Sequence, residues 1–218
     1  MNWTHYKKSD IQDLERICRL NLINSISGYK PANLIGTKSK DGQSNLAIFS
    51  SVVHLGSNPA LLGMVTRPTS VQRDTYDNIL ASGKYTINHI PSQSTAMAHY
   101  TSAKFASDES EFDHCHFKES YLAEFPVPFV ESSPIKMAMK LEQTIPIDLN
   151  QTILIIGSVE HLFFHESLIE ADGSLNLEAS QSACISGLNS YYQATRLAKY
   201  PYARVGESPI NLLNQEVL

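Results

Sequence analysis

Cysteine is scarce in this chain of 218 residues. The three cysteines, Cys18, Cys115 and Cys184, lie far apart and form no C-x-x-C pair. Isolated thiols are typical of a reducing cytoplasm and argue against a disulfide-stabilised secreted scaffold, and nothing marks Cys115 as an activated nucleophile. Charged residues make up only 18% of the chain, so long disordered segments are not expected. We therefore predict a folded cytoplasmic protein.

Long apolar runs and basic clusters are also missing. The longest strongly apolar run, Ile153 to Ile156, is far shorter than the roughly 20 residues of a membrane-spanning helix. Residues 1–16 are polar and mixed in charge, unlike a signal peptide. The net charge of −5 argues against a nucleic-acid partner or an anionic membrane surface. We predict neither a nucleic-acid nor a membrane partner.

Several catalytic and metal-binding signatures are absent. No G-x-G occurs, which excludes a Rossmann dinucleotide loop and a P-loop, and there is no G-x-S-x-G or H-E-x-x-H sequence. His114 and His116 would share one face of a strand predicted at 112–117, but two imidazoles alone do not make a zinc site. His161 and His165 have no helix to place them on one face. We therefore predict no metal site.

The sequence does contain short strand patterns joined by tight turns. Besides the possible strand at 112–117, we predict six clear strands, at residues 32–39, 45–54, 60–66, 84–90, 135–145 and 152–164. Asp41-Gly42 is a hairpin signal between the first two. Short strands with tight turns favour an antiparallel sheet or barrel over parallel βαβ units. No linker or repeat divides the chain, so we predict a single, mainly β domain over residues 1–218.

Short helices are expected around these strands. They are predicted at residues 9–22, from about 71 to Gly83, at 92–100 and at 189–199. Ser9 is a suitable cap for the first helix, whose apolar residues share a face that we expect to pack on the core. Gly83 is suited to a left-handed C-cap that ends the second helix.

The loop before the second helix combines cations with hydroxyl groups: it contains Arg67, Thr69, Ser70, Arg73 and Thr75. Thr69 and Ser70 are placed to cap the free N–H groups of the helix. Cations, hydroxyls and free N–H groups together suit a phosphate. The alternative, an ordinary capped and solvated helix, remains open at this stage.

The order of polar residues over 28–206 resembles that of a known family. The matching segments are Asn45-x4-Ser50-Ser51, Asn58-Pro59, Arg67-Pro68, Arg73-Asp74-Thr75-x2-Asn78-Ile79, Gly83-x-Tyr85-x-Ile87-Asn88, Ala103-Lys104-Phe105, Ser110-Glu111-Phe112, Gly187-Leu188-x2-Tyr191-Tyr192 and Tyr202-Ala203-Arg204. No single segment is specific, but the ordered series resembles the flavin reductase-like proteins, which have an FMN-binding split barrel.

This resemblance implies a six-stranded Greek-key antiparallel barrel with short helices. It also implies a homodimer that holds FMN, or FAD in some members, noncovalently near the subunit interface. The implied phosphate-binding positions are Ser50, Ser51, Arg67 and Lys104, with Thr75 nearby. The implied positions facing the isoalloxazine ring are Asn45, Ala47, Phe49, Asn88, His89 and Ile90.

The resemblance further implies an NAD(P)H-dependent flavin oxidoreductase. A reduced nicotinamide would pass a hydride to the flavin, which would serve a partner oxygenase or stay bound as a prosthetic group. This chemistry needs no general base, and no catalytic residue is assigned. Two alternatives remain: a flavin-binding electron carrier of the flavoredoxin type, and a non-enzymatic dimeric split-barrel binding protein. The choice between NADH and NADPH and the final electron acceptor also stay open.

Overall fold

The computed structural model describes residues 2–71, 73–106 and 108–217, and its centre is a seven-stranded antiparallel sheet. The strand order is β3-β2-β6-β9-β10-β5-β4. The strands are β2 (Asn33–Lys38), β3 (Ser44–Phe49), β4 (Val53–Ser57), β5 (Ala60–Thr66), β6 (Lys84–His89), β9 (Ile135–Ile147) and β10 (Thr152–Phe164). All pairs in this sheet are antiparallel, as predicted.

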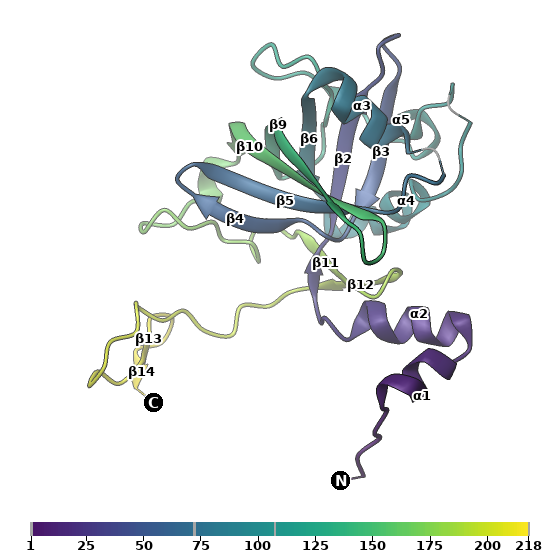
Figure 1. Cartoon of the computed structure of the whole chain (residues 1–218). Coiled ribbons are helices and arrows are strands. Elements are labelled where there is room, and N and C mark those ends of the chain that lie inside the picture. Colours follow the sequence, from purple (N-terminus) through teal and green to yellow (C-terminus); the bar gives the residue numbers. More distant parts are fainter. Residues whose placement is uncertain (1, 72, 107, 218) are drawn as a thin grey trace.

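The two edge strands of this sheet, β3 and β4, are joined by residues 50–52 alone. Because so short a connection joins both edges, the sheet must curl until they meet, which makes a barrel (Figure 1). The prediction of one continuous strand over 45–54 is therefore wrong. Before residues 50–52 the chain pairs with β2, as β3, and after them it pairs with β5, as β4. The sheet therefore has seven strands where six were expected.

Hydrophobic cores lie on both faces of β2. Leu34 and Ile35 are adjacent and fully buried, yet they belong to different clusters, because successive strand residues point to opposite faces. Ile35 packs inside the barrel, where Ile79 from helix α3 (Asp74–Ser82) also lies. Leu34 packs with Phe112 outside the barrel, under the short helices.

Those helices are η1 (Ser92–Ser94), α4 (Thr95–Tyr100) and α5 (Glu111–His114). The predicted strand at 112–117 is wrong, because the Ser110 hydroxyl accepts a hydrogen bond from the Phe112 N–H and starts helix α5. A 3-10 turn, η2 (Glu166–Leu168), follows β10.

Helix α3 begins at Asp74, three residues later than predicted. Arg73 is its N-cap residue, so the prediction that Thr69 and Ser70 cap the helix is wrong. The predicted end is confirmed: Gly83 has φ +68° and its N–H donates to the Ile79 carbonyl oxygen at 2.8 Å.

Smaller sheets carry the remaining strands. These are β1 (Lys30–Pro31), β11 (Ala183–Ser186) and β12 (Ser190–Gln193) in one sheet, β7 (Glu119–Ser120) with β8 (Phe129–Val130), and β13 (Ile210–Asn211) with β14 (Glu216–Val217). The predicted helix at 189–199 is wrong. Tyr191 and Tyr192 pair across strands with Ile185 and Cys184, as suits aromatic residues in strands.

The chain starts with two helices, α1 (Lys8–Asp13) and α2 (Arg16–Ser25), in place of the single helix predicted at 9–22. Leu14 has ψ 143°, which breaks the helix, and the Glu15 carboxylate caps α2. Neither helix has a buried residue, so the expected packing on the core is wrong. Both extend away from the barrel (Figure 1).

We call residues 2–29 the N-terminal arm and residues 194–217 the C-terminal tail. The tail is tied to the loop after β10 by ion pairs. Lys199 contacts Glu170 and Asp172, and Arg196 lies 2.7 Å from Glu170. In the described ranges, no helix combines the length and apolar character that crossing a membrane requires.

Candidate functional site

A buried hydrogen-bond network joins three of the segments that carry the resemblance. The Thr75 hydroxyl on α3 donates to Asn45 Oδ1 at 3.3 Å. Asn45 Nδ2 in turn donates to Glu111 Oε2 at 2.9 Å, and so does the Leu46 N–H. The side chains of Asn45 and Thr75 therefore hold α3, β3 and α5 together. Glu111 belongs to one of the matching segments, but the resemblance implies no role for it.

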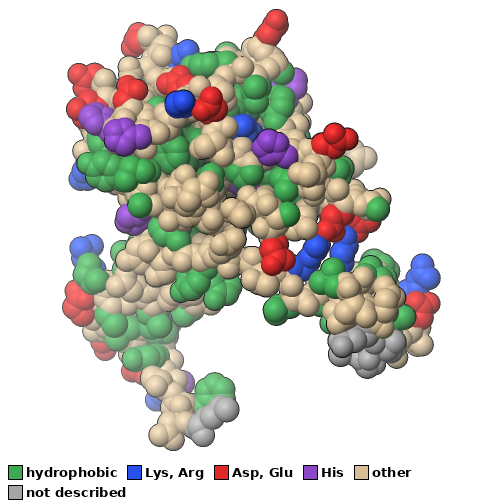
Figure 2. Space-filling model, turned by 180° about the vertical axis from the view of Figure 1, so that it is seen from behind, with side chains coloured by type: hydrophobic (Ala, Val, Ile, Leu, Met, Phe, Trp, Pro, Cys, Tyr) green, Lys and Arg blue, Asp and Glu red, His purple; other side chains and the backbone are tan. Residues whose placement is uncertain are grey.

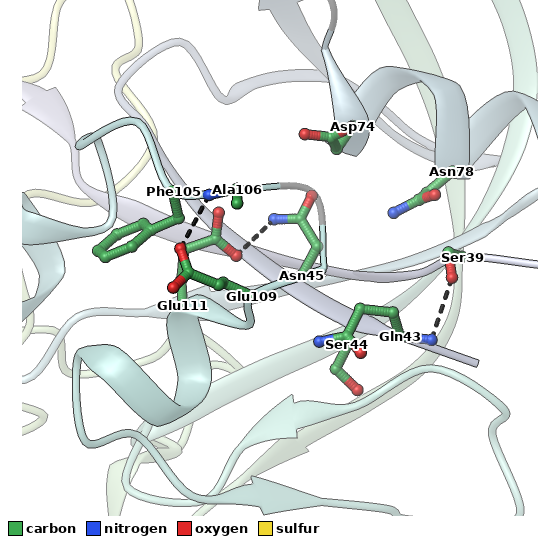
Figure 3. Close-up of a pocket in the computed structure, with 10 residues that line it drawn as sticks. All are labelled: Ser39, Gln43, Ser44, Asn45, Asp74, Asn78, Phe105, Ala106, Glu109 and Glu111. Atoms are coloured by element: carbon green, nitrogen blue, oxygen red, sulfur yellow. Dashed lines mark hydrogen bonds between the residues drawn. The ribbon is translucent and has the colours of Figure 1, made fainter. Parts of the chain in front are cut away.

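A small cavity of about 50 Å³ lies beside this network (Figure 3). Three carboxylates line it, from Asp74, Glu109 and Glu111. Burial raises the pKa of Glu111, although hydrogen bonds from Leu46 and Asn45 oppose the shift. One water takes about 30 Å³ in the liquid. This cavity is therefore too small and too acidic to be a flavin phosphate site by itself.

The implied phosphate residues come from three segments: residues 50–51 at the barrel corner, the loop after β5, and the loop between α4 and α5. Ser50 is half-buried at the corner, while Arg67, just after β5, and Lys104 are exposed. Neither Arg67 nor Lys104 forms an ion pair with any residue that the structure describes. Ser51 differs, because its hydroxyl donates to the carbonyl oxygen of Val65 and accepts from its N–H, both at 3.0 Å. Two cations and one hydroxyl thus remain for an anion.

The start of α3 is less suited to an anion than the sequence suggested. Asp74 and Asp77 lie in the first helical turn and place negative charge at its N-terminus. The Thr75 hydroxyl is committed to Asn45. Arg73 Nε donates to the Pro68 carbonyl oxygen at 3.4 Å. A phosphate at this loop would therefore be bound by the loop's cations and not by the N-terminus of α3.

Strand β3 lies at the end of the strand order, so one side of its backbone pairs with no strand. Leu46 directs its N–H away from β2, to Glu111, and antiparallel strands alternate in this respect, so the Ile48 N–H points the same way. Ala47 and Phe49 pair with β2 residues, and Phe49 packs against the core inside the barrel. A planar ring along this edge would therefore meet backbone groups more than the Ala47 and Phe49 side chains.

The end of β6 contains buried polar residues. Asn88 is fully buried, and its amide donates to the Leu34 carbonyl oxygen and to Thr86 and accepts from the Val130 N–H. Its side chain therefore serves the fold. His89 Nδ1 lies 3.1 Å from the Ser182 hydroxyl, and burial lowers the pKa of His89 to about 4. The imidazole is neutral at pH 7.

Between Phe49 and His89 lies Asn33, which pairs across strands with both. Asn33 is 1% exposed, and neither its Oδ1 nor its Nδ2 has a hydrogen-bond partner among the residues that the structure describes. Buried amides are rarely left so. A water molecule or a polar ligand atom would satisfy them. The Asn33 amide therefore lies next to Phe49 and His89, two of the positions predicted to face the flavin ring.

The histidine pair considered for a metal does not share a strand face. His114 ends α5, with its Nε2 3.4 Å from Glu109 Oε1 and its ring stacked on Phe105. His116 follows with φ +56°. Over residues 2–71, 73–106 and 108–217, no group of three or more His, Cys, Asp or Glu side chains is placed to hold a metal ion.

A larger cavity, of about 550 Å³, was not predicted from the sequence. It lies between β1, β11 and β12, and its lining includes Tyr29, Ala32, His89, Cys184 and Tyr192. The rings of Tyr29 and Tyr192 meet edge to face with centroids 4.8 Å apart. Only the tertiary pairing of β11 with β1 and β12 brings these residues together.

Residues 29–181 match the family model of the flavin reductase like domain. The chain belongs to this family. The match spans the whole seven-stranded sheet and ends before β11. Membership confirms the resemblance seen in the sequence, and with it the mainly β split-barrel fold.

Solved structures of similar proteins extend this likeness. A protein from Shewanella frigidimarina, assigned as a flavin reductase with a split barrel domain, is 41% identical, covering 92% of this chain and 100% of its own, with a TM-score of 0.89. Nitrilotriacetate monooxygenase component B from Bacillus cereus is 20% identical over 91% and 100%, with a TM-score of 0.81. Flavoredoxin of Desulfovibrio vulgaris is 19% identical over 83% and 94%, with a TM-score of 0.71. The last two show the fold alone.

Proposed function

We propose that this flavin reductase family member binds FMN and acts as an NAD(P)H-dependent flavin oxidoreductase. The observation that carries the proposal is the edge of β3 that has no strand partner. It runs from the Asn45–Glu111 network to the corner at Ser50, and Arg67 and Lys104, on the loops after β5 and before α5, form no ion pair with any described residue. Edge N–H groups and cations are the donors that a flavin ring and its phosphate need.

Each group of residues would have its own task. Arg67, Lys104 and the Ser50 hydroxyl would bind the dianionic phosphate, because charge-assisted hydrogen bonds are strong enough to offset its desolvation. Outward N–H groups near Ile48 would bind carbonyl oxygens of the ring. Asn45 and Thr75 would fix this edge in position from behind, through the network described above.

Bound FMN would supply the redox chemistry, with NADH or NADPH as electron donor. The protein would orient the reactants and exclude water. No general base is needed, and the neutral, buried His89 is consistent with that. We further propose a cytoplasmic homodimer that passes reduced flavin to an oxygenase; the likeness to a component named for a monooxygenase supports such a partner.

The test is spectroscopic. Purified protein should bind FMN in titrations and should oxidise NADH or NADPH when FMN is present, measured at 340 nm. A protein that neither binds FMN nor oxidises either nicotinamide is not a flavin reductase. Repeating both measurements with FAD in place of FMN shows which flavin the protein prefers.

The second candidate is a flavin-binding electron carrier, favoured by the likeness to flavoredoxin. Stopped-flow reduction of the bound flavin separates the two candidates. An oxidoreductase reduces its flavin with NADPH or NADH much faster than free flavin reacts. A carrier binds FMN equally well and shows no such acceleration.

A further inference from the structure

The 550 Å³ cavity is large enough for a small molecule and has mainly apolar walls. Its lining includes Pro31, Ala32, Leu177 and Ala183. Binding pockets for small molecules commonly span about 300–1,000 Å³ and combine such walls with a few polar groups that orient the ligand. The chemistry of those few polar groups therefore decides what this cavity can hold.

One wall of the cavity lies outside the part of the chain that matches the family model. The match ends at residue 181, whereas Ser182 to Cys184 and Tyr192 to Thr195 line the cavity. The cavity also lies away from the proposed flavin edge, because strand β2 separates β6, which ends at His89, from β3. Two strand spacings amount to about 10 Å. The cavity is therefore a candidate for a second site.

The cavity opens where the N-terminal arm and the C-terminal tail leave the barrel. Tyr29 is the last residue of the arm, and Ala194 and Thr195 are the first of the tail; all three line the cavity. The space between the arm and the tail is open (Figure 1), and the view from behind shows the same separation (Figure 2). A small molecule can consequently reach the cavity from solvent.

The lining of the cavity favours an uncharged ligand. Among the described residues it contains no Asp or Glu, so a cation would find no counter-charge there. Lys30 also lines the cavity, but its ammonium already donates to the carbonyl oxygens of Asn24 at 3.0 Å and Gly187 at 3.1 Å. A charged ligand would thus leave water without adequate compensation.

A chain of hydrogen bonds beside the cavity fixes the position of the proton on His89. The Ser180 hydroxyl donates its single hydrogen to the Leu177 carbonyl oxygen at 2.7 Å. The Ser182 hydroxyl, 2.8 Å from that of Ser180, must therefore donate to it, and can only accept from His89 Nδ1 at 3.1 Å. Burial lowers the pKa of His89 to about 4, so the ring is neutral at pH 7 and carries one hydrogen, on Nδ1. His89 Nε2 then has a lone pair.

This lone pair lacks a donor. Nε2 has no hydrogen-bond partner among the residues that the structure describes, and His89 lines the cavity. A buried acceptor left unpaired costs free energy, which a ligand hydroxyl in the cavity would recover. Tyr29 and Tyr192, whose rings meet edge to face in the same lining, offer apolar surfaces against which a further aromatic ring packs well.

We propose that this cavity binds a small uncharged phenol, whose hydroxyl donates to His89 Nε2 while its ring packs against Tyr29 and Tyr192. A phenol hydroxyl, with a pKa of about 10, is a better donor than an aliphatic hydroxyl and still uncharged at pH 7. The site goes beyond the flavin function proposed above and does not depend on it.

The first test is a calorimetric titration with p-cresol and with its methyl ether, in which a methyl group replaces the hydroxyl hydrogen. p-Cresol should bind about tenfold or more tightly than the ether, because the ether leaves Nε2 unpaired. The ether is the more apolar of the two, so a cavity that recognised apolar surface alone would prefer the ether.

Variants assign this preference to the imidazole. His89→Phe keeps a ring but removes the acceptor, and it should bind p-cresol no better than the ether. His99→Phe is the matched control and should keep the preference: His99 Nδ1 is also 3.1 Å from a hydroxyl, that of Tyr191, but His99 is exposed and outside the lining. Ser182→Ala repeats the test if His89→Phe does not fold, because the hydrogen can then move to Nε2 and the preference should fall.

The second test locates the bound phenol. Cys184 lines the cavity and is half-buried, Cys115 is 1% exposed, and the exposed Cys18 can be removed as Cys18→Ser. Saturating p-cresol should slow the modification of Cys184 by a small disulfide reagent about tenfold or more, because a covered thiolate cannot react. The protection should persist when excess FMN is added.

Equal affinity for p-cresol and its ether, or no binding of either, would overturn the proposed site. A preference that survives in both His89→Phe and Ser182→Ala would overturn the role of the imidazole. Unprotected Cys184 would place the phenol elsewhere, and displacement of p-cresol by FMN would make the cavity part of the flavin site. The titrations need neither flavin nor nicotinamide, so their failure is distinguishable from a failure of the proposed redox function.

Discussion

The Ser51 hydroxyl bridges both backbone groups of Val65, donating to its carbonyl oxygen and accepting from its N–H at 3.0 Å each. This bridge attaches the corner between β3 and β4 to β5. It lies just before the β4–β5 strand pairing, which begins at Val53 and Gly63. Ser51→Ala should therefore lower the free energy of unfolding by about 1–3 kcal/mol, since two backbone groups lose their partner. Urea denaturation measures this loss.

Ser50→Ala is the control for that change. Ser50 is half-buried at the same corner, and its hydroxyl makes no hydrogen bond to a residue that the structure describes. The Ser50→Ala protein should keep wild-type stability but should bind FMN more weakly. Equal losses of stability in both variants would show that the Val65 bridge is not what stabilises the corner.

Gly157 in β10 faces Tyr85 at close range. A Cβ there would overlap the Tyr85 hydroxyl and lie 2.9 Å from the Lys140 carbonyl oxygen. Tyr85 is 1% exposed and has no room to move away. Gly157→Ala should lower the melting temperature and cost about 1–3 kcal/mol by overpacking. Gly56→Ala, whose Cβ would come no closer than 3.3 Å to another residue, should cost much less.

His89 makes the stability of the fold depend on pH. Burial lowers the pKa of His89 from 6.5 to about 4, so the unfolded chain takes up a proton at higher pH than the folded one. The contribution of the neutral His89 side chain to the free energy of unfolding is complete above pH 6.5 and is lost as the pH falls towards 4. We expect a loss of about 2 kcal/mol between pH 7.5 and 5, which His89→Gln abolishes.

Unfolding curves in urea at several pH values measure that slope. His54 is exposed on β4, and His54→Gln should retain the wild-type pH dependence. A His89→Gln protein with the same slope as wild type would assign the pH dependence to other groups.

Lys199 attaches the tail through Glu170 and Asp172. The Lys199 and Arg196 side chains lower the pKa of Glu170 to about 2, so these ion pairs persist above pH 4.5 and are lost as the pH falls towards 2. Lys199→Ala should speed amide hydrogen exchange in residues 194–204 at pH 7. Lys140→Ala, which removes a more exposed ion pair with Glu142 on the barrel, should leave exchange in the tail unchanged.

Much of the barrel could be predicted from the sequence because its signals are local. The strand at Ala60–Thr66 has the predicted bounds, and Gly83 ends α3 as expected. Tertiary context decided the rest. The break at residues 50–52 follows from the change of partner strand, and helix α5 follows from the Ser110 cap, which overrides an alternating pattern.

The candidate site shows the same division. Residue order identified the family and the segments around β3, but not which side chains are already committed. Asn88 and Ser51 were predicted to contact the cofactor, and their hydrogen bonds to the fold are visible only in three dimensions. The 550 Å³ cavity joins residues from 29 to 195, and no local pattern marks it.

The most direct test of the central claim is a titration of FMN into the purified protein. Arg67→Ala and Lys104→Ala should each weaken FMN binding by about tenfold or more, because each removes a charge-assisted contact to the phosphate. Lys118→Ala, at an exposed lysine 3.9 Å from Glu131, should bind FMN as wild type does. Wild-type protein that does not bind FMN, or unchanged affinity in both variants, would contradict the account.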